Sequence, residues 1–185
     1  MSGHVLFAGE KGAFGEEFCR TYLAKRTPLG VASFAVVVEG VAEGRAECGV
    51  VPTRNSRAGP VDGVSELLEN TAIRTVDHQW LAVRMHCLAV PSATLDDIAE
   101  VRSHPMALRQ SFDFLNRHCW NRVEVGDTAL AARQVAEEGN PRIAAFASRA
   151  AAQAYGLSIL AENVHDDAAN RTEFAIIVRR DSAAA

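Results

Sequence analysis

Short apolar runs alternate with longer segments in which apolar and polar residues mix at helical spacing. A run of four to eight apolar residues closed by glycine or proline is typical of a buried strand. The segments expected to contain strands are residues 4–9, 31–46 (leading into a short helix or loop), 49–51, 75–91, 121–127, 142–148, 157–163 and 172–180.

The intervening segments predict helices. Gly139 and Gly156 are expected to end two of them, and Thr94, followed by Asp96 and Asp97, resembles a capped helix start. Residues 10–26 and 59–71 are each expected to form a turn followed by a helix, and Ser103 and Pro105 precede the helix expected within 102–119. The other predicted helical segments are residues 94–101, 128–139 and 149–156. Regular alternation of strands and helices predicts an α/β fold with largely parallel sheets.

Composition narrows the class of protein. The chain has 185 residues, enough for one domain or two small lobes, and a formal net charge of −4. This charge argues against a general nucleic-acid partner but leaves room for a local cationic pocket. Neither a signal-peptide layout nor an apolar run of about 20 residues is present, so we expect a soluble, cytoplasmic protein with no membrane partner.

The cysteines and histidines show no metal-ligand spacing, so no metal and no cofactor are expected. The four cysteines form no CxxC pair and are expected to be reduced thiols, mostly buried. His104 could be an acid or base, but a lone histidine is more often structural.

Loops that follow strands are the candidates for chemistry, because ligands of α/β sheets gather at the carboxyl ends of strands. GEKGAFG (residues 9–15) is either an anion-binding loop or a tight glycine turn. VPTRNSRAG (51–59) offers forked arginine donors for carboxylates or is a solvated loop. Thr128 stands at a helix start, where a hydroxyl is most often an N-cap.

Taken together and in order, these motifs resemble the catalytic domain of prephenate dehydratases. The matching segments are GEKGAF, PTRNSRAG (52–59), SHPMALRQS (103–111), DTALAA (127–132), AAFASRAAAQAYGL (144–157) and NRTEF (170–174). The resemblance implies a two-lobed α/β domain like a type II periplasmic binding protein, with its active site in the interlobe cleft. It divides the chain into lobe 1 (1–79 plus 168–185) and lobe 2 (80–167).

The resemblance also implies a reaction and a site. The family converts prephenate, a small dicarboxylate, into phenylpyruvate by losing carbon dioxide and the ring hydroxyl, within phenylalanine biosynthesis. Thr172 takes the place of the family's catalytic threonine, and a homodimer is plausible. The implied substrate-binding residues are Gly12, Ala13, Phe14, Arg54, Asn55, Ser56, Gln110, Thr128, Ala129, Glu173 and Phe174.

Two departures exchange charges within the motifs: Arg54 replaces the family's glutamate and Glu173 its arginine. Either the two rebuild one ion pair with reversed polarity, or a carboxylate beside Thr172 alters the pocket. Gly15 also replaces a serine or threonine, and Ser111 a cysteine. The chain ends just after the last predicted strand, so no regulatory ACT domain is expected.

Three hypotheses follow from these departures. The first is a lyase acting on prephenate or a close analogue. The second is a divergent lyase of a specialised pathway, for instance one that decarboxylates without forming an aromatic ring. The third is a non-catalytic ligand-binding module.

Overall fold

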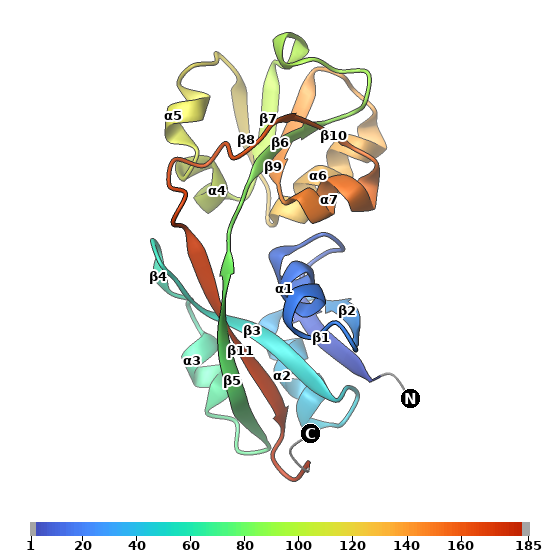
Figure 1. The fold of residues 1–185 in the computed structure, drawn as a ribbon, viewed down its shortest axis with the longest axis vertical. Helices are drawn as coiled ribbons and strands as arrows, with labels where there is room; N and C mark the ends of the chain where they lie inside the picture. Colours follow the sequence, from blue (N-terminus) through green and yellow to red (C-terminus); the bar gives the residue numbers. More distant parts are fainter. Residues whose placement is uncertain (1–2, 183–185) are drawn as a thin grey trace. The chain divides into compact units, whose positions relative to one another are not determined.

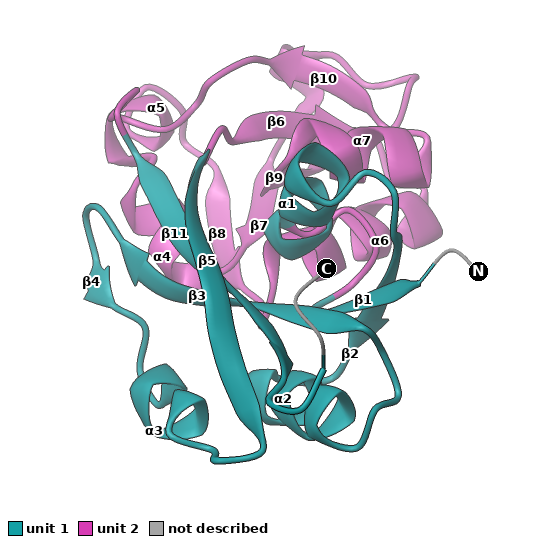
Figure 2. Cartoon of the chain, turned by 60° about the horizontal axis from the view of Figure 1, so that its bottom comes forward, with its two compact units in different colours: residues 1–9, 14–82, 170–185 teal, residues 10–13, 83–169 magenta. Residues whose placement is uncertain are grey.

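The computed structural model describes residues 3–182, whose contacts divide into two compact units (Figures 1 and 2). Unit 1 contains the described residues of 1–9, 14–82 and 170–185, and unit 2 contains residues 10–13 and 83–169. The units therefore change over at 82/83 and 169/170, and a four-residue segment near the N-terminus belongs to unit 2.

Unit 1 is built on a mixed sheet with the strand order β2-β1-β3-β11-β5, to which β4 adds a short pairing with β3. The strands β1, β2 and β3 run parallel, whereas β11 lies antiparallel between β3 and β5. The elements of this unit are β1 (His4–Ala8), α1 (Phe14–Tyr22), β2 (Thr27–Val31), α2 (Phe34–Ala42), β3 (Cys48–Asn55), β4 (Gly59–Pro60), α3 (Val64–Leu68), β5 (Ile73–Ala82) and β11 (Arg171–Arg179).

The two faces of this sheet are covered by different helices. On one face, Ala175 and Ile177 of β11 join a buried cluster with Val37 of α2 and Val64 of α3. On the other face, the ring of Phe174 packs 4.7 Å from that of Phe18 on α1. Alternate residues of β11 therefore face α2 and α3, and the residues between them face α1.

Unit 2 has a second mixed sheet with the order β10-β6-β9-β7-β8. Its strands β8, β7 and β9 are mutually parallel, β6 runs antiparallel to β9, and β10 runs antiparallel to β6 at the edge of the sheet. The elements are β6 (His86–Ala89), the 3₁₀ turn η1 (Leu95–Asp97), β7 (Glu100–Ser103), α4 (Pro105–Arg109), α5 (Phe112–Leu115), β8 (Asn121–Glu124), α6 (Thr128–Glu138), β9 (Ile143–Ala147), α7 (Arg149–Tyr155) and β10 (Ser158–Ala161).

The α/β class predicted from the sequence is confirmed, but the expectation of largely parallel sheets is wrong. Parallel pairs form only between strands of one unit that are joined by a connection containing at least one helix. The long strands β5 and β11 carry the chain out of unit 1 and back again, so they run in opposite directions in one sheet. Each unit therefore combines parallel and antiparallel pairs.

Three local predictions also need correction, and one strand was missed. Residues 34–42 form a helix, α2, although valines suggested strand; Ser33 caps its start by accepting a hydrogen bond from the N–H of Val36. The expected helix at 94–101 is a single 3₁₀ turn followed by β7. The single helix expected within residues 102–119 is broken into α4 and α5, and β2 was missed because its TPLGV sequence, with a proline and a glycine, carries no strand signal.

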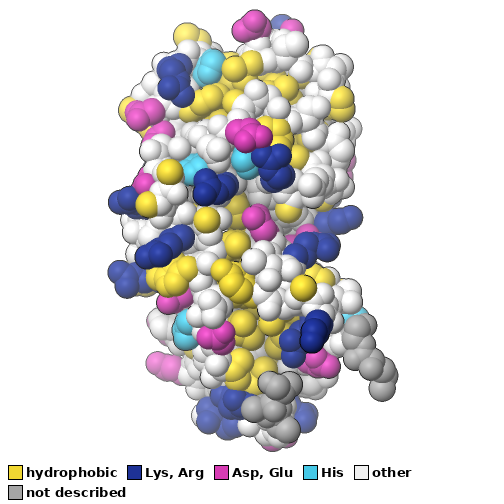
Figure 3. All heavy atoms as spheres, viewed as in Figure 1, with side chains coloured by type: hydrophobic (Ala, Val, Ile, Leu, Met, Phe, Trp, Pro, Cys, Tyr) yellow, Lys and Arg dark blue, Asp and Glu magenta, His cyan; other side chains and the backbone are white. Residues whose placement is uncertain are grey.

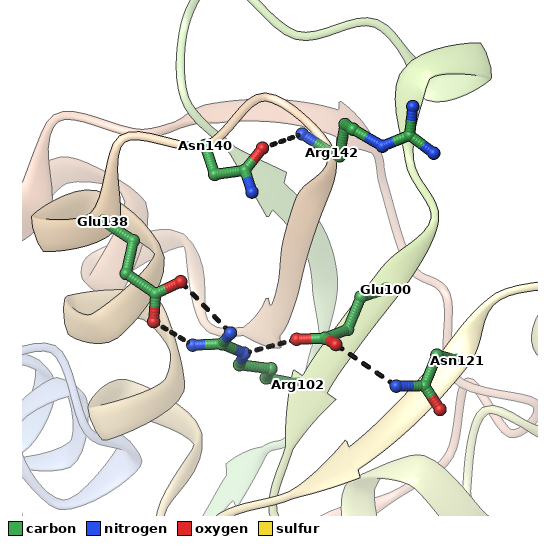
Figure 4. A network of polar contacts seen from close by, with 6 residues as sticks. All are labelled: Glu100, Arg102, Asn121, Glu138, Asn140 and Arg142. Carbon is green, nitrogen blue, oxygen red and sulfur yellow. Dashed lines mark hydrogen bonds and ion pairs between the residues drawn. The ribbon is translucent and has the colours of Figure 1, made fainter.

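An ionic network anchors α6 on the sheet of unit 2 (Figure 4). Arg102 of β7 donates to both carboxylate oxygens of Glu138 at the end of α6, and its Nε donates to Glu100 at 2.7 Å. The hydrogen bonds from Arg102 lower the pKa of Glu138. Arg102 is mostly buried, so the two hydrogen bonds from its guanidinium to Glu138 fix the position of α6 relative to β7.

Two buried histidines attach the segment after β10 to β6. Nδ1 of His86 accepts from the N–H of Asn163, and Nδ1 of His165 accepts from the N–H of Met85. Burial lowers the pKa of both imidazoles, and nearby arginines act in the same direction. Both side chains are therefore neutral in the folded chain at neutral pH.

We expect the free energy of unfolding to fall as the pH is lowered through about 6.5, the ordinary histidine pKa. Unfolding exposes both histidines, so the unfolded chain binds protons at a pH at which the folded chain does not. Urea denaturation of the wild type between pH 7.5 and 5 measures this loss. Replacing both His86 and His165 with glutamine should flatten the profile, whereas His4→Gln, at an exposed position, should leave it intact; an unchanged profile in the double variant contradicts this assignment.

No helix within residues 3–182 is both long and apolar enough to cross a bilayer. Three cysteines of this range, Cys19, Cys48 and Cys87, are buried and Cys119 is exposed, all as free thiols.

Candidate active site

Asn55, Asn170 and Thr172 form a hydrogen-bonded cluster in unit 1. Asn55 ends β3, and Thr172 lies opposite it on β11. Nδ2 of Asn55 donates to Oγ1 of Thr172 and to Oδ1 of Asn170, both at 3.0 Å. Asn170 is 2% exposed, so this side of the cluster is closed to solvent.

The orientation of the Asn55 amide follows from its other contacts. Its Oδ1 accepts from the backbone N–H groups of Arg57 and Ala58, at 2.9 and 3.0 Å. Because a backbone N–H can only donate, this end of the amide must be the oxygen. The NH₂ end therefore faces Thr172, and both of its hydrogens are used.

This arrangement decides what the Thr172 hydroxyl can do. Its oxygen accepts from Asn55, so the hydroxyl proton is left to donate elsewhere. No acceptor for that proton is present among the residues that the structure describes. Thr172 is half-buried, so the cluster presents a positioned hydrogen-bond donor whose direction is set by its neighbour.

Thr172 and Glu173 lie on opposite faces of the sheet. Thr172 shares its face with Phe174, which packs on α1, whereas Glu173 shares its face with Ala175, which packs with α2. The carboxylate of Glu173 instead accepts from the hydroxyl of Thr53 at 2.7 Å and lies 3.7 Å from Nδ1 of His78. The hypothesis of a carboxylate beside Thr172 is therefore not supported by this geometry.

The alternative hypothesis, a reversed ion pair between Arg54 and Glu173, is not supported either. Their Cα atoms are register partners, but the pairing shifts by one residue between Glu173 and Phe174, which leaves Thr53 as an extra residue. Such a bulge turns two residues of β3 toward one position of β11. Thr53 takes the contact with Glu173, and within residues 3–182 the two charged side chains form no ion pair.

We expect restoration of the family charges to change turnover little. Arg54→Glu and Glu173→Arg alter the face of the sheet that Thr172 does not share, so each variant should keep kcat within about threefold, the size of a surface effect. The coupling energy from the double-mutant cycle should stay below about 0.5 kcal/mol, since no ion pair is broken. A larger coupling, measured in kcat or in urea stability, would show that the two side chains meet.

The loop GEKGAF has a structural role in unit 2. Gly12 has φ +87°, and a Cβ on it would lie 2.5 Å from Cα of Ala151 in α7. Its carbonyl accepts from the buried hydroxyl of Ser148 at 2.6 Å. Glycine is thus required here for the close approach of the loop to α7, which is the turn interpretation of this motif.

At the start of α6, the capping residue is Asp127 and not Thr128. Oδ1 of Asp127 accepts from the N–H groups of Ala129 and Leu130, at 2.7 and 3.0 Å. The N–H of Ala129 is therefore already used. The hydroxyl of Thr128 makes no hydrogen bond within the described part of the chain and is half-buried, so it is available as a donor or acceptor.

The SHPMALRQS segment continues from the carboxyl end of β7. Nδ1 of His104 accepts from the N–H of Met106 and so caps α4, which gives this histidine a structural role. Gln110 ends α4, and its carbonyl accepts from the N–H of Asp166 at 2.7 Å. Ser111 is fully buried, and its hydroxyl has no hydrogen-bond partner within residues 3–182.

The remaining predicted site residues divide between core and surface. Ala13 and Phe174 are buried, at 4% exposure each, and Phe174 belongs to the core under α1. Phe14 is the half-buried first residue of α1. Ser56 is exposed and exchanges two hydrogen bonds with Arg171, which fasten the loop after β3 to β11.

Sequence reasoning left out Asn170, Thr53 and Asp127. Asn170 stood in the quoted NRTEF segment, just before the strand that carries Thr172, and this closeness in sequence to Thr172 is the signal that could have found it. No group of three potential metal-ligand side chains gathers within the residues described.

The fold and the cluster define a class: a small α/β protein of two units, of which unit 1 presents an oriented threonine hydroxyl. The family model of prephenate dehydratase matches residues 5–182. The chain therefore belongs to the prephenate dehydratase family, and the resemblance found in its motifs is confirmed.

Individual relatives agree with this assignment. The chain is 32% identical to the bifunctional chorismate mutase/prephenate dehydratase of Escherichia coli K12, over 97% of this chain and 48% of the relative. It is 34% identical to the solved structure of GqqA, a quorum-quenching acylase of a novel type, with a TM-score of 0.90 over 98% of this chain and 66% of that one. The chain thus spans about half the length of the E. coli relative.

A more distant likeness concerns the fold alone. The methionine-binding protein MetQ superposes with a TM-score of 0.51 at 11% identity, over 97% of this chain and 83% of that one. This supports the predicted relation to periplasmic-binding-protein folds.

Proposed function

We propose that this chain is a carbon–oxygen lyase of the prephenate dehydratase type, acting on prephenate or a close analogue. The family assignment over residues 5–182 supports the reaction class. The observation that carries the proposal is the hydrogen bond from Asn55 to Thr172, because it occupies the hydroxyl oxygen as an acceptor and leaves the threonine proton to donate to a substrate. A hydroxyl oriented in this way suits a departing ring hydroxyl.

The reaction needs one group to leave as an anion. As the carboxylate on the ring carbon departs as carbon dioxide, its bonding electrons enter the ring, which becomes aromatic. The carbon–oxygen bond at the opposite ring position breaks, and the hydroxyl leaves with its electron pair. One proton from solvent completes the water, so the products are phenylpyruvate, carbon dioxide and water.

Thr172 acts in this step as a donor and not as a strong acid. An alcohol hydroxyl is barely acidic, so it stabilises the leaving oxygen through a hydrogen bond that strengthens as negative charge develops. Asn55 holds the donor in place, since its amide is fixed by the loop N–H groups on one end and by Asn170 on the other. This preorganisation removes the cost of orienting the hydroxyl during the reaction.

Binding of the two substrate carboxylates requires further donors. We assign Thr128 and Gln110 to this role, on the resemblance of their motifs to the family's. The hydroxyl of Thr128 has no partner within the described residues, which supports the assignment. Thr128→Val should raise KM with little change in kcat, because this contact is equal in the ground and transition states.

Incubation of the purified chain with prephenate tests the proposal. We expect absorbance of phenylpyruvate in alkali to appear with release of one carbon dioxide. Loss of carbon dioxide with the hydroxyl retained, detected by mass spectrometry, would replace this proposal with a non-aromatising decarboxylation. A thermal shift with prephenate but without any product would replace it with a binding module.

The homodimer, the cytoplasmic location and a place in phenylalanine or specialised metabolism remain predictions. Sedimentation velocity tests the first.

A further inference from the structure

Unit 1 contains a cavity that the proposed reaction does not use. Its volume is about 710 Å³, which lies in the range of small-molecule sites. The lining residues all belong to unit 1 and come from the segment after α1, from β3 and the residue before it, from β5 and β11, and from Ser182.

The floor of the cavity is formed by three neighbouring strands. Val178 of β11 is paired with Cys48 of β3 on one side and with Arg74 of β5 on the other. Opposed residues point to the same face of a sheet, so these three side chains stand in one row. Ile176 continues the apolar floor on the same face of β11.

A bulge opens this floor toward solvent. The pairing of β11 with β5 shifts between Ile176 and Ile177, which leaves Val76 as an extra residue on β5. Val76 is 43% exposed, an unusual state for a valine in a long strand. Figure 3 shows hydrophobic side chains at the surface of this part of the molecule, with basic side chains beside them.

Two arginines, Arg26 and Arg74, line the cavity, and they differ in whether a carboxylate neutralises their charge. Arg26 is neutralised by Glu47, whose Oε2 lies 3.1 Å from its Nε. Arg74 donates to the carbonyl of Ser182 at 3.2 Å but faces no carboxylate within residues 3–182. Arg74 is half-buried, and Cys48, on the far side of Val178, is a neutral thiol, since burial raises its pKa to about 11. Among the described residues, the cavity therefore combines an apolar floor with one cation that pairs with no carboxylate.

The cavity is separate from the Thr172 cluster, although β11 contributes to both. Thr172 is paired with Leu81 and Asn55, whereas Val178 is paired with Arg74 and Cys48. Six residues of a strand span about 20 Å, so one small ligand cannot occupy both places.

We propose that this cavity binds a small amphipathic monocarboxylate, with its apolar body on Val178 and Ile176 and its carboxylate on Arg74. The planar fork of an arginine matches the two oxygens of a carboxylate, and a partly buried guanidinium gains most from such a partner. A dicarboxylate is disfavoured, because its second charge would lie on the apolar floor.

Binding of 3-phenylpropanoate, followed by NMR titration, tests the proposal, with 3-phenylpropan-1-ol and succinate as matched probes lacking the charge or the apolar body. We expect 3-phenylpropanoate to bind at least about tenfold more tightly than either, the usual effect of one charge-assisted contact. Equal binding of the alcohol would overturn the role of Arg74, and equal binding of succinate would overturn that of the floor.

Variants locate the site. Arg74→Gln should weaken 3-phenylpropanoate binding about tenfold, and Val76→Glu should weaken it by placing a carboxylate beside Arg74. Arg179→Gln is the control, because Arg179 lies on the other face, opposite Ile73, and pairs with Asp181. Val76 is exposed, so its variant should fold, and a circular dichroism spectrum checks this.

Thr172→Ala separates the two proposals. It should leave binding of 3-phenylpropanoate unchanged even if it abolishes turnover of prephenate. If it removes binding while Arg74→Gln does not, the ligand occupies the Thr172 cluster and the second site is overturned. Failure of the dehydratase assay alone leaves this result unaffected.

Discussion

Replacing Thr172 with valine is expected to lower kcat for prephenate by about 10²–10³-fold, the usual effect of removing one positioned donor from a developing oxyanion. Valine keeps the branched shape of threonine and removes only the hydroxyl, so packing on the α1 face of β11 should be preserved. KM should change by less than about threefold, because the hydrogen bond strengthens mainly in the transition state. Initial rates of phenylpyruvate formation measure both constants.

Two further variants test the orientation of the hydroxyl. Thr172→Ser keeps the donor and should retain activity within about tenfold of the wild type, well above the loss for valine. Asn55→Asp should act like a partial loss of Thr172, because a carboxylate at this place accepts the threonine proton instead of donating to its oxygen. If the valine variant lost kcat and substrate binding equally, Thr172 would have a binding role, and equal activity in all three would refute the assignment.

The faces of β11 on which Thr172 and Glu173 lie could be predicted from strand alternation in the sequence. The NRTEF motif alone does not give them. Residues 172–180 were expected to form a strand, and successive residues of a strand point to opposite faces. Thr172 and Glu173 could therefore not share one pocket wall. The motif treats both as neighbours, and only the alternation separates the residue that is positioned for chemistry from the one whose charge has been exchanged.

The partner of Glu173 was beyond sequence reasoning. It depends on a bulge that inserts Thr53 into the pairing of β3 with β11, and a bulge has no reliable signal in a Pro-Thr-Arg-Asn sequence.

The ends of α6 and α7, in contrast, were predictable from the sequence. Gly139 and Gly156 both adopt left-handed φ angles, of 64° and 67°, as their places after alanine-rich segments indicated.

The valine-rich segment 34–42 shows why local composition misled the secondary-structure prediction. The branched side chain of valine is stiff, so valine favours strands. The free-energy cost of placing it in a helix is nevertheless no more than a few tenths of a kcal/mol per residue. In α2 this preference is outweighed by burial of Val37, Val38 and Val41 against the sheet. Tertiary packing decides whether such a segment forms a helix or a strand. The only helix signal in the sequence itself is the capping residue Ser33.

Gly12→Ala is expected to destabilise unit 2 by about 3 kcal/mol or more, among the larger effects of a single substitution. Two costs add at this position. Alanine in a left-handed conformation costs about 1–2 kcal/mol, and its Cβ would also meet backbone atoms of Ala151, at 2.5 and 2.9 Å, which cannot rotate away. Either α7 shifts or the loop leaves it, and both break the hydrogen bond from Ser148 to the Gly12 carbonyl.

Gly156→Ala separates the two costs. Gly156 follows the same helix, α7, with φ +67°, but a Cβ there meets no atom within 4 Å. It should therefore lose only the conformational cost, about 1–2 kcal/mol. Urea denaturation of the wild type and both variants measures the difference. Equal losses would show that α7 yields to the added methyl group at Gly12, so that the close approach to Ala151 does not require glycine.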